Sequence, residues 1–235
     1  MTPVEFWLPI GAIAFYLYDS AQLLWHNELL YVRGAGRWHA EGPASISMMG
    51  RRLYLPNPLL PQRPAFKVHW RLAEERAAAT SPDDFLRALR PIGLIALLLA
   101  WLLVLLPLVS WTLGTGVTLL AVFALYYVLV IVALVFVLRR RAVLQLSGSA
   151  CASLVFDALA CAPFATNLVR KIAMRRGLEG DPISFAGAQF EPAGREALRQ
   201  LLLRKLDEQQ AGEPSSAEVQ GQIAVLLGKL GDSST

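Results

Sequence analysis

Residues 92–138 read IGLIALLLAWLLVLLPLVSWTLGTGVTLLAVFALYYVLVIVALVFVL, and this stretch decides the fold class. It holds two apolar runs, 92–112 and 117–138, separated by a few uncharged residues around Gly114 and Gly116. About 20 residues of α-helix match the thickness of the hydrocarbon core of a bilayer. A link this short makes two helices run antiparallel. The sequence therefore predicts a transmembrane helical hairpin.

A short cytosolic helix is predicted to lead into this hairpin, so that residues 81–138 form one segment. Ser81, Pro82 and Asp83 supply a capping hydroxyl, a proline at the first helical position and an acid in the first turn. Pro91 follows, and because the residue before a proline avoids the helical conformation, we expect a bend there.

A third span is predicted at residues 4–25, within a first segment 1–25. Thr2, Pro3 and Glu5 form a helix-start pattern. Thr2 supplies a capping hydroxyl, and the Glu5 carboxylate, three residues later, can reach back to the free amides of the first turn. No Lys or Arg precedes Arg33, whereas a cleavable signal peptide begins with a basic stretch. We therefore interpret this segment as a span that the protein retains.

The basic residues fix the orientation expected of these spans. Of the 22 Lys and Arg residues, 10 lie between His26 and Arg90, and the other 12 lie from Arg139 onward. Loops that stay in the cytosol are enriched in Lys and Arg. Three spans with the N-terminus in the periplasm and the C-terminus in the cytosol place every basic residue inside. The expected location is the bacterial inner membrane, as a multi-pass α-helical protein with three transmembrane helices.

Segment 139–177 is expected to lie at the cytosolic membrane surface. Residues 148–168 are apolar enough for a fourth span, but Asp157 and Pro163 interrupt them and basic clusters flank both ends. A charge at mid-bilayer is unfavourable by about 2.5–3.5 kcal/mol. We favour an interfacial or re-entrant element, followed by an amphipathic helix over 166–176 that Gly177 ends. The residues expected to contact anionic lipid headgroups are Arg139, Arg140, Arg141, Arg170, Lys171, Arg175 and Arg176.

Two further cytosolic segments are expected to form a small α+β part. Residues 26–80 are rich in Gly and Pro and indicate short strands, including a hairpin that turns at Gly50 and a strand over 65–72. Trp38, Tyr54, Phe66 and Trp70 are candidates for a small core or for an aromatic belt at the headgroups. Residues 178–235 indicate a helical tail, with helices over 193–209 and 215–230.

Asp19 is the most informative polar residue, because acids inside membrane spans are rare and usually functional. On a continuous helix it shares one stripe with Tyr16, Gln22 and His26, which serves assembly or transport in our interpretation. Asp19 lies about 9 Å from the predicted end of the span. There it could pair with a basic residue of the interfacial segment or of a partner subunit.

The sequence contains no catalytic, cofactor-binding or metal-ligating motif. His26 and Glu28 lack the spacing that aims two ligands at one point, and Cys151 and Cys161 are expected to be reduced, apolar fillers. No phosphate-binding loop, dinucleotide-binding glycine pattern or nucleophile elbow is present. A net charge of +4 without a basic–aromatic motif argues against nucleic acid as a partner.

The leading hypothesis is a non-enzymatic anchor or assembly subunit of the inner membrane, which presents a cytosolic module to a protein partner or a second copy. Three spans are too few to enclose a pathway within one chain. Two alternatives stay open at this point. One is a subunit of an oligomeric transporter or channel with Asp19 in its pathway. The other is a membrane enzyme acting on a lipid-borne substrate, with Asp157 and Cys161 at the floor of its site.

Overall fold

The computed structural model describes residues 3–25, 27–43, 46–48, 50–69, 82–113, 116–178 and 181–212. The protein is mostly helical, with two long apolar helices and a small strand part. The described residues divide into two units. The first draws on Met1–Gln22, Leu55–Pro64 and Pro82–Arg176, and the second on Leu23–Tyr54, Ala65–Ser81 and Gly177–Thr235.

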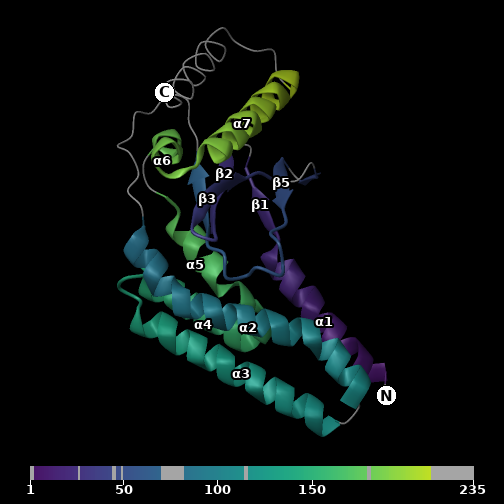
Figure 1. Ribbon diagram of the computed structural model, residues 1–235. Helices are drawn as coiled ribbons and strands as arrows, with labels where there is room; N and C mark the ends of the chain where they lie inside the picture. The colour runs from purple at the N-terminus through teal and green to yellow at the C-terminus, as the bar shows by residue number, and fades with distance from the viewer. Residues whose placement is uncertain are drawn as a thin grey trace. The chain divides into compact units, whose positions relative to one another are not determined.

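The hairpin of the first unit consists of α2 (Asp83–Leu113) and α3 (Gly116–Arg139), which pack side by side (Figure 1). Among the described residues, Asp83–Leu108 and Gly116–Arg139 are long and apolar enough to cross a membrane. Helix α2 continues through Pro91, so the expected lead-in helix and the first apolar run form one element. Leu89 and Ile92 on either side of this proline are buried, and their packing helps to offset the hydrogen bond that Pro91 cannot make.

Helix α1 (Pro3–Ser20) is shorter than the span expected at 4–25. Its 18 residues rise about 27 Å. The Ser20 hydroxyl turns back and donates to the carbonyl of Leu17 (2.8 Å). The next residues form strand β1 (Gln22–Leu24), which joins a small sheet. A strand partner far along the chain therefore ends this helix, and the local sequence does not reveal that partner.

The segment expected at the membrane surface is broken into three short elements: α4 (Gly148–Ala160), η1 (Ala162–Asn167) and α5 (Leu168–Arg176). At 13 residues, α4 is shorter than the roughly 20 that a spanning helix needs. Pro163 lies in the first turn of the 3₁₀ helix η1, and Gly177 (φ +63°) follows α5 as the predicted stop. Element η1 contacts α1, α2, α3, α4 and α5, so it lies at the centre of the first unit.

The second unit contains two small sheets (Figure 1). One has the order β3 (Arg37–Glu41), β2 (Glu28–Gly34), β6 (Ala65–His69), with both pairs antiparallel. The other has the order β1, β5 (Arg51–Tyr54), β4 (Ser47–Met48). Gly50, between β4 and β5, has a positive φ (+73°), which confirms the predicted hairpin turn.

Helices α6 (Pro182–Gln189) and α7 (Pro192–Gly212) complete the second unit, and α7 confirms the first predicted tail helix. Its core is an aromatic cluster in which Trp38 packs against Phe66 and Phe185 (ring centroids 5.6 and 5.1 Å apart). Trp38 and Phe66 were predicted from the sequence as core candidates, whereas Phe185 of the tail was not. Trp70 and the helix expected at 215–230 lie outside the described residues.

Candidate functional site

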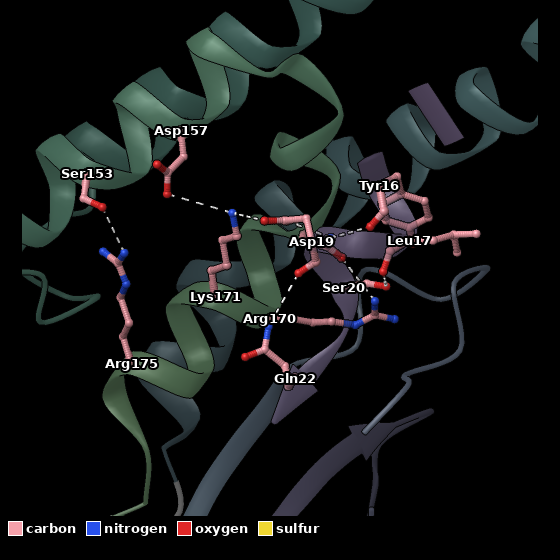
Figure 2. A network of polar contacts seen from close by, with 11 residues as sticks. Tyr16, Leu17, Asp19, Ser20, Gln22, Ser153, Asp157, Arg170, Lys171 and Arg175 are labelled. Carbon is pink, nitrogen blue, oxygen red and sulfur yellow. Dashed lines mark hydrogen bonds and ion pairs between the residues drawn. The ribbon is translucent and has the colours of Figure 1, made fainter. Parts of the chain in front are cut away.

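The first unit contains a network of polar side chains around the end of α1, and Asp19 is its central acid (Figure 2). One Asp19 oxygen, Oδ1, lies 2.7 Å from Nζ of Lys171, while Oδ2 accepts from Nδ2 of Asn167 at 3.0 Å. The Asp19 and Lys171 side chains are only 11% and 17% exposed. A carboxylate near the C-terminal end of a helix meets an unfavourable dipole, so it needs a cation close by. Lys171 supplies that cation.

Lys171 also faces a second acid, and Figure 2 shows it between Asp19 and Asp157. Asp157 Oδ2 lies 4.0 Å from the ammonium, farther than Asp19, and its side chain is 38% exposed. The ammonium also lies 4.8 Å from the centroid of the Phe164 ring. The lysine is therefore held by one close carboxylate, one distant carboxylate and one aromatic face.

Arg170, the neighbour of Lys171 on α5, is buried and binds a carbonyl-lined loop. Its Nη2 donates to the main-chain carbonyls of Asn57 and Leu60, the latter at 3.0 Å. The hydroxyl of Tyr16 donates to the carbonyl of Pro58 in the same loop. Prolines within residues 55–64 lack amide donors and keep this stretch out of a strand ladder, so its carbonyls remain available. A planar guanidinium suits two adjacent acceptors of this kind.

Asn167 joins the two halves of the network. Its Nδ2 donates to Asp19 and to the carbonyl of Tyr16 (3.3 Å), while its Oδ1 accepts from Arg170 (3.2 Å). The preceding residue, Thr166, shares a 2.7 Å hydrogen bond with the hydroxyl of Tyr126 on α3. Asn167 and Thr166 are both buried, so η1 fastens α1, α3 and α5 through polar contacts inside an apolar unit.

The structure divides the predicted stripe of Tyr16, Asp19, Gln22 and His26. Tyr16 and Asp19 meet through Asn167. Gln22 belongs to β1 rather than to the helix, although its side chain still reaches the carbonyl of Asp19 at 3.5 Å. His26 lies outside the described residues. Two pairings were open to Asp19, with a basic residue of segment 139–177 or with one of a partner subunit, and the structure shows the first, with Lys171.

The basic residues expected to contact lipid headgroups differ in their burial and in their hydrogen-bond partners. Arg170 is buried, because the basic side of α5 faces the carbonyl loop and Asp19. Arg175 donates to the Ala150 carbonyl (2.7 Å), and Arg176 donates to the side chain of Gln145 (3.0 Å). Arg140 donates to the carbonyl of Ala88 (3.2 Å). Contacts of Arg139 and Arg141, which are exposed, with lipid stay a prediction.

The second unit buries an acid of its own, Glu28. Its carboxylate lies 3.2 Å from Nζ of Lys67 and 3.0 Å from Nε2 of His69, and it accepts from the amide of Trp25 (3.0 Å). Burial by itself raises the pKa of Glu28, but the Trp25 amide, Lys67 and His69 together bring it below its ordinary value. Lys205 donates to the main-chain carbonyl of Glu28 (2.7 Å), which ties α7 to β2.

The chemistry open to these groups is limited. Burial raises the pKa of the Cys161 thiol, which keeps it protonated and a poor nucleophile near neutral pH. Among the described residues, no three His, Cys, Asp or Glu side chains are arranged to hold a metal ion. The polar network joins charges from α1 and α5 to main-chain carbonyls, an arrangement that holds helices in fixed positions.

Sequence reasoning missed Asn57, Asn167 and Tyr126 as members of the network. For Asn57 and Asn167 the signal lies in two stretches that join proline and asparagine, LPNPLL at 55–60 and CAPFATNL at 161–168, and neither stretch includes Tyr126. The first supplies the carbonyls, and the second supplies the 3₁₀ helix that carries Asn167.

No protein-family model, no curated protein and no solved structure matches this chain.

Proposed function

We propose that this protein is a non-enzymatic anchor or assembly subunit of the bacterial inner membrane, with α1, α2 and α3 as three spans. The N-terminus is periplasmic, the C-terminus is cytosolic, and the strand-containing unit is presented to a protein partner or a second copy. The proposal rests on one observation about α2 and α3. Large apolar side chains are exposed along both helices: Leu94, Leu98, Trp101, Leu105, Leu108, Val117, Leu120, Val128, Ile131, Val135 and Leu138.

Apolar exposure on this scale favours a lipid environment. Each Å² of apolar surface removed from water is favourable by about 25 cal/mol, and lipid chains supply such a surface. The absence of Lys and Arg from residues 91–138 and 1–25 supports the direction of insertion, since basic residues stay on the cytosolic side.

The internal bonding of the polar network favours an anchor over a transport subunit. Both oxygens of Asp19 have close donors, and Arg170 and Asn167 bind carbonyls of the same unit. A pathway residue has to exchange partners with a passing ion or proton. Bonding this complete serves instead to hold α1 against η1 and α5.

Two measurements test the proposal together. Alkaline phosphatase and green fluorescent protein fused after Arg141, and separately after Thr235, should report the cytosolic side in both cases; phosphatase activity at either site contradicts the topology. Cross-linking of the whole protein in its native membrane, read by mass spectrometry, should recover a stoichiometric neighbour attached to the strand-containing unit. A homogeneous monomer without cross-links contradicts the role in assembly.

A further inference from the structure

Among the described residues, one face of the β1-β5-β4 sheet in the second unit carries exposed apolar side chains. Met48 and Arg51 are register partners, and the Leu53 amide donates to the Ile46 carbonyl at 2.9 Å. Because side chains two apart in a strand share a face, these four residues lie on one side. Exposed fractions reach 54% for both Ile46 and Met48.

Strand β1 extends the same face. The guanidinium of Arg51 lies 4.3 Å from the centroid of the Trp25 ring, so Trp25 lies on the Arg51 side of the sheet. Leu23, two residues before Trp25, is 40% exposed, whereas Leu24 between them is buried on the opposite side. We call this surface the Trp25 face; its residues are Leu23, Trp25, Ile46, Met48, Arg51 and Leu53.

The composition of the Trp25 face fits the headgroup region of a bilayer. Among the described residues of this sheet, the face carries a cation and no acid. Tryptophan is enriched where water meets hydrocarbon, and a guanidinium binds phosphate oxygens in a planar, two-point manner. An aromatic ring with a stacked arginine therefore offers apolar contact and phosphate binding at one point.

We propose that the Trp25 face docks on an anionic phospholipid surface. The inference rests on the proposed function, because it takes α1 as a span whose last residue is at the cytosolic side. Leu23 follows Ser20 by three residues, and three residues of extended chain reach only about 10 Å. The first strand of the face is therefore tethered close to the headgroups. A protein partner at this face would be expected to place an acidic side chain against Arg51. The test below distinguishes a protein partner from lipid.

The test places a fluorophore at three positions of the full-length protein, in a Cys151→Ala, Cys161→Ala background. Met48→Cys reports the Trp25 face, and Ser47→Cys, its exposed neighbour on the opposite face, is the matched control. Val128→Cys, 55% exposed on α3, reports insertion of the spans. Vesicles contain phosphatidylcholine and phosphatidylglycerol with doxyl lipids, and iodide serves as the aqueous quencher.

The expected result is strong doxyl quenching at Val128→Cys and at Met48→Cys, with Ser47→Cys quenched by iodide instead. Arg51→Gln should lower the docked-to-undocked ratio about fivefold in anionic vesicles, the effect of one charge near the surface. Quenching of Met48→Cys by iodide as strongly as Ser47→Cys overturns the docking while Val128→Cys still supports the spans. Shielding of Met48→Cys from both quenchers means that protein covers the face, which also overturns it. Loss of doxyl quenching at Val128→Cys overturns the proposed function itself.

Discussion

Each unit of this protein buries a carboxylate against a lysine, but the two pairs are assembled in different ways. Asp19 in α1 meets Lys171 in α5, two helices far apart in the chain. Glu28 lies directly opposite His69 in the β2–β6 register, and Lys67 is two residues from His69 on the same strand. Helix packing makes the first pair, and strand register makes the second.

The difference also affects how water reaches each pair. The Lys171 side chain is 17% exposed, whereas the His69 side chain is 51% exposed. The Glu28 cluster is therefore in contact with bulk water through a half-exposed partner. The Asp19–Lys171 pair itself is largely buried, and an unpaired charge is far less tolerated there. We expect the first unit to respond mainly to loss of a partner and the second to respond also to pH.

The largest effect is expected for Lys171→Met, which leaves Asp19 without its ammonium. Removing one partner of a buried pair lowers the free energy of unfolding by about 3–5 kcal/mol, because the remaining charge stays buried. Thermal unfolding of the detergent-solubilised protein measures the change. Asp19→Asn with Lys171→Met should recover part of the loss, since neither charge then remains.

The matched control for this variant is Arg87→Met in the same unit. Arg87 and Asp84 form an ion pair (2.6 Å), but their side chains are 79% and 85% exposed. Exposed pairs contribute about 0–1 kcal/mol. Equal losses in the two variants would remove the contrast between a buried and a solvated pair.

The second prediction concerns pH and the second unit. The pKa of Glu28 in the folded protein is lower than its ordinary value of 4.5, so the folded state binds fewer protons near that pH. Its stabilising contribution is present above about pH 4.5 and is lost as the pH falls through the lowered pKa. Glu28→Gln should lower the free energy of unfolding by about 1.5–3 kcal/mol at pH 7 and flatten its acid dependence.

Near-ultraviolet circular dichroism of the aromatic cluster, followed against urea from pH 3 to pH 7, measures this dependence. Glu196→Gln is the control, because Glu196 is 53% exposed and, among the described residues, contacts Arg199 and Gln200 of its own helix. A Glu28→Gln variant with the same acid dependence as the native protein would show that the cluster does not link folding to pH.

The same contrast explains what the sequence could reveal. Periodicity and charge placement predicted the two long apolar helices, and local signals predicted the turn at Gly50 and the end of α5 at Gly177. The pairing of Asp19 with the basic segment was also predictable, because a buried acid needs a cation. These features depend on residues close in the chain or on a rule of charge.

What the sequence did not reveal depends on contacts between distant segments. Helix α1 ends at Ser20 because the residues after it pair with β5. Arg170 is buried because it donates hydrogen bonds to the carbonyls of Asn57 and Leu60. Nothing near Arg170 in the sequence distinguishes it from an arginine that contacts lipid headgroups. The amphipathic spacing of α5 separates an apolar face from a basic face. It does not predict whether the basic face contacts lipid or a carbonyl-lined loop.

The third prediction examines that carbonyl loop. Arg170→Lys keeps the charge but loses the planar guanidinium, whose Nη2 donates to Asn57 and Leu60 while its Nη1 donates to Asn167. We expect the free energy of unfolding to fall by about 1–2 kcal/mol. Amide hydrogen exchange should rise within residues 55–64. Arg175→Lys is the control, since Arg175 binds Ala150 and Ser153 at the surface of the same unit. Faster exchange throughout the protein would indicate general destabilisation rather than release of the loop.

The smallest effect on the free energy of unfolding is expected for the uncharged hydrogen bond between Tyr126 and Thr166. Tyr126→Phe removes only the hydroxyl that bonds Thr166, and a neutral hydrogen bond contributes about 1 kcal/mol. Because Thr166 is fully buried, the single variant leaves its hydroxyl unsatisfied. Tyr126→Phe with Thr166→Val removes both polar atoms and should be closer to native stability than Tyr126→Phe alone, measured by thermal unfolding. A double variant that loses as much as Lys171→Met would mean that the hydroxyls, rather than the Asp19–Lys171 pair, hold η1 in place.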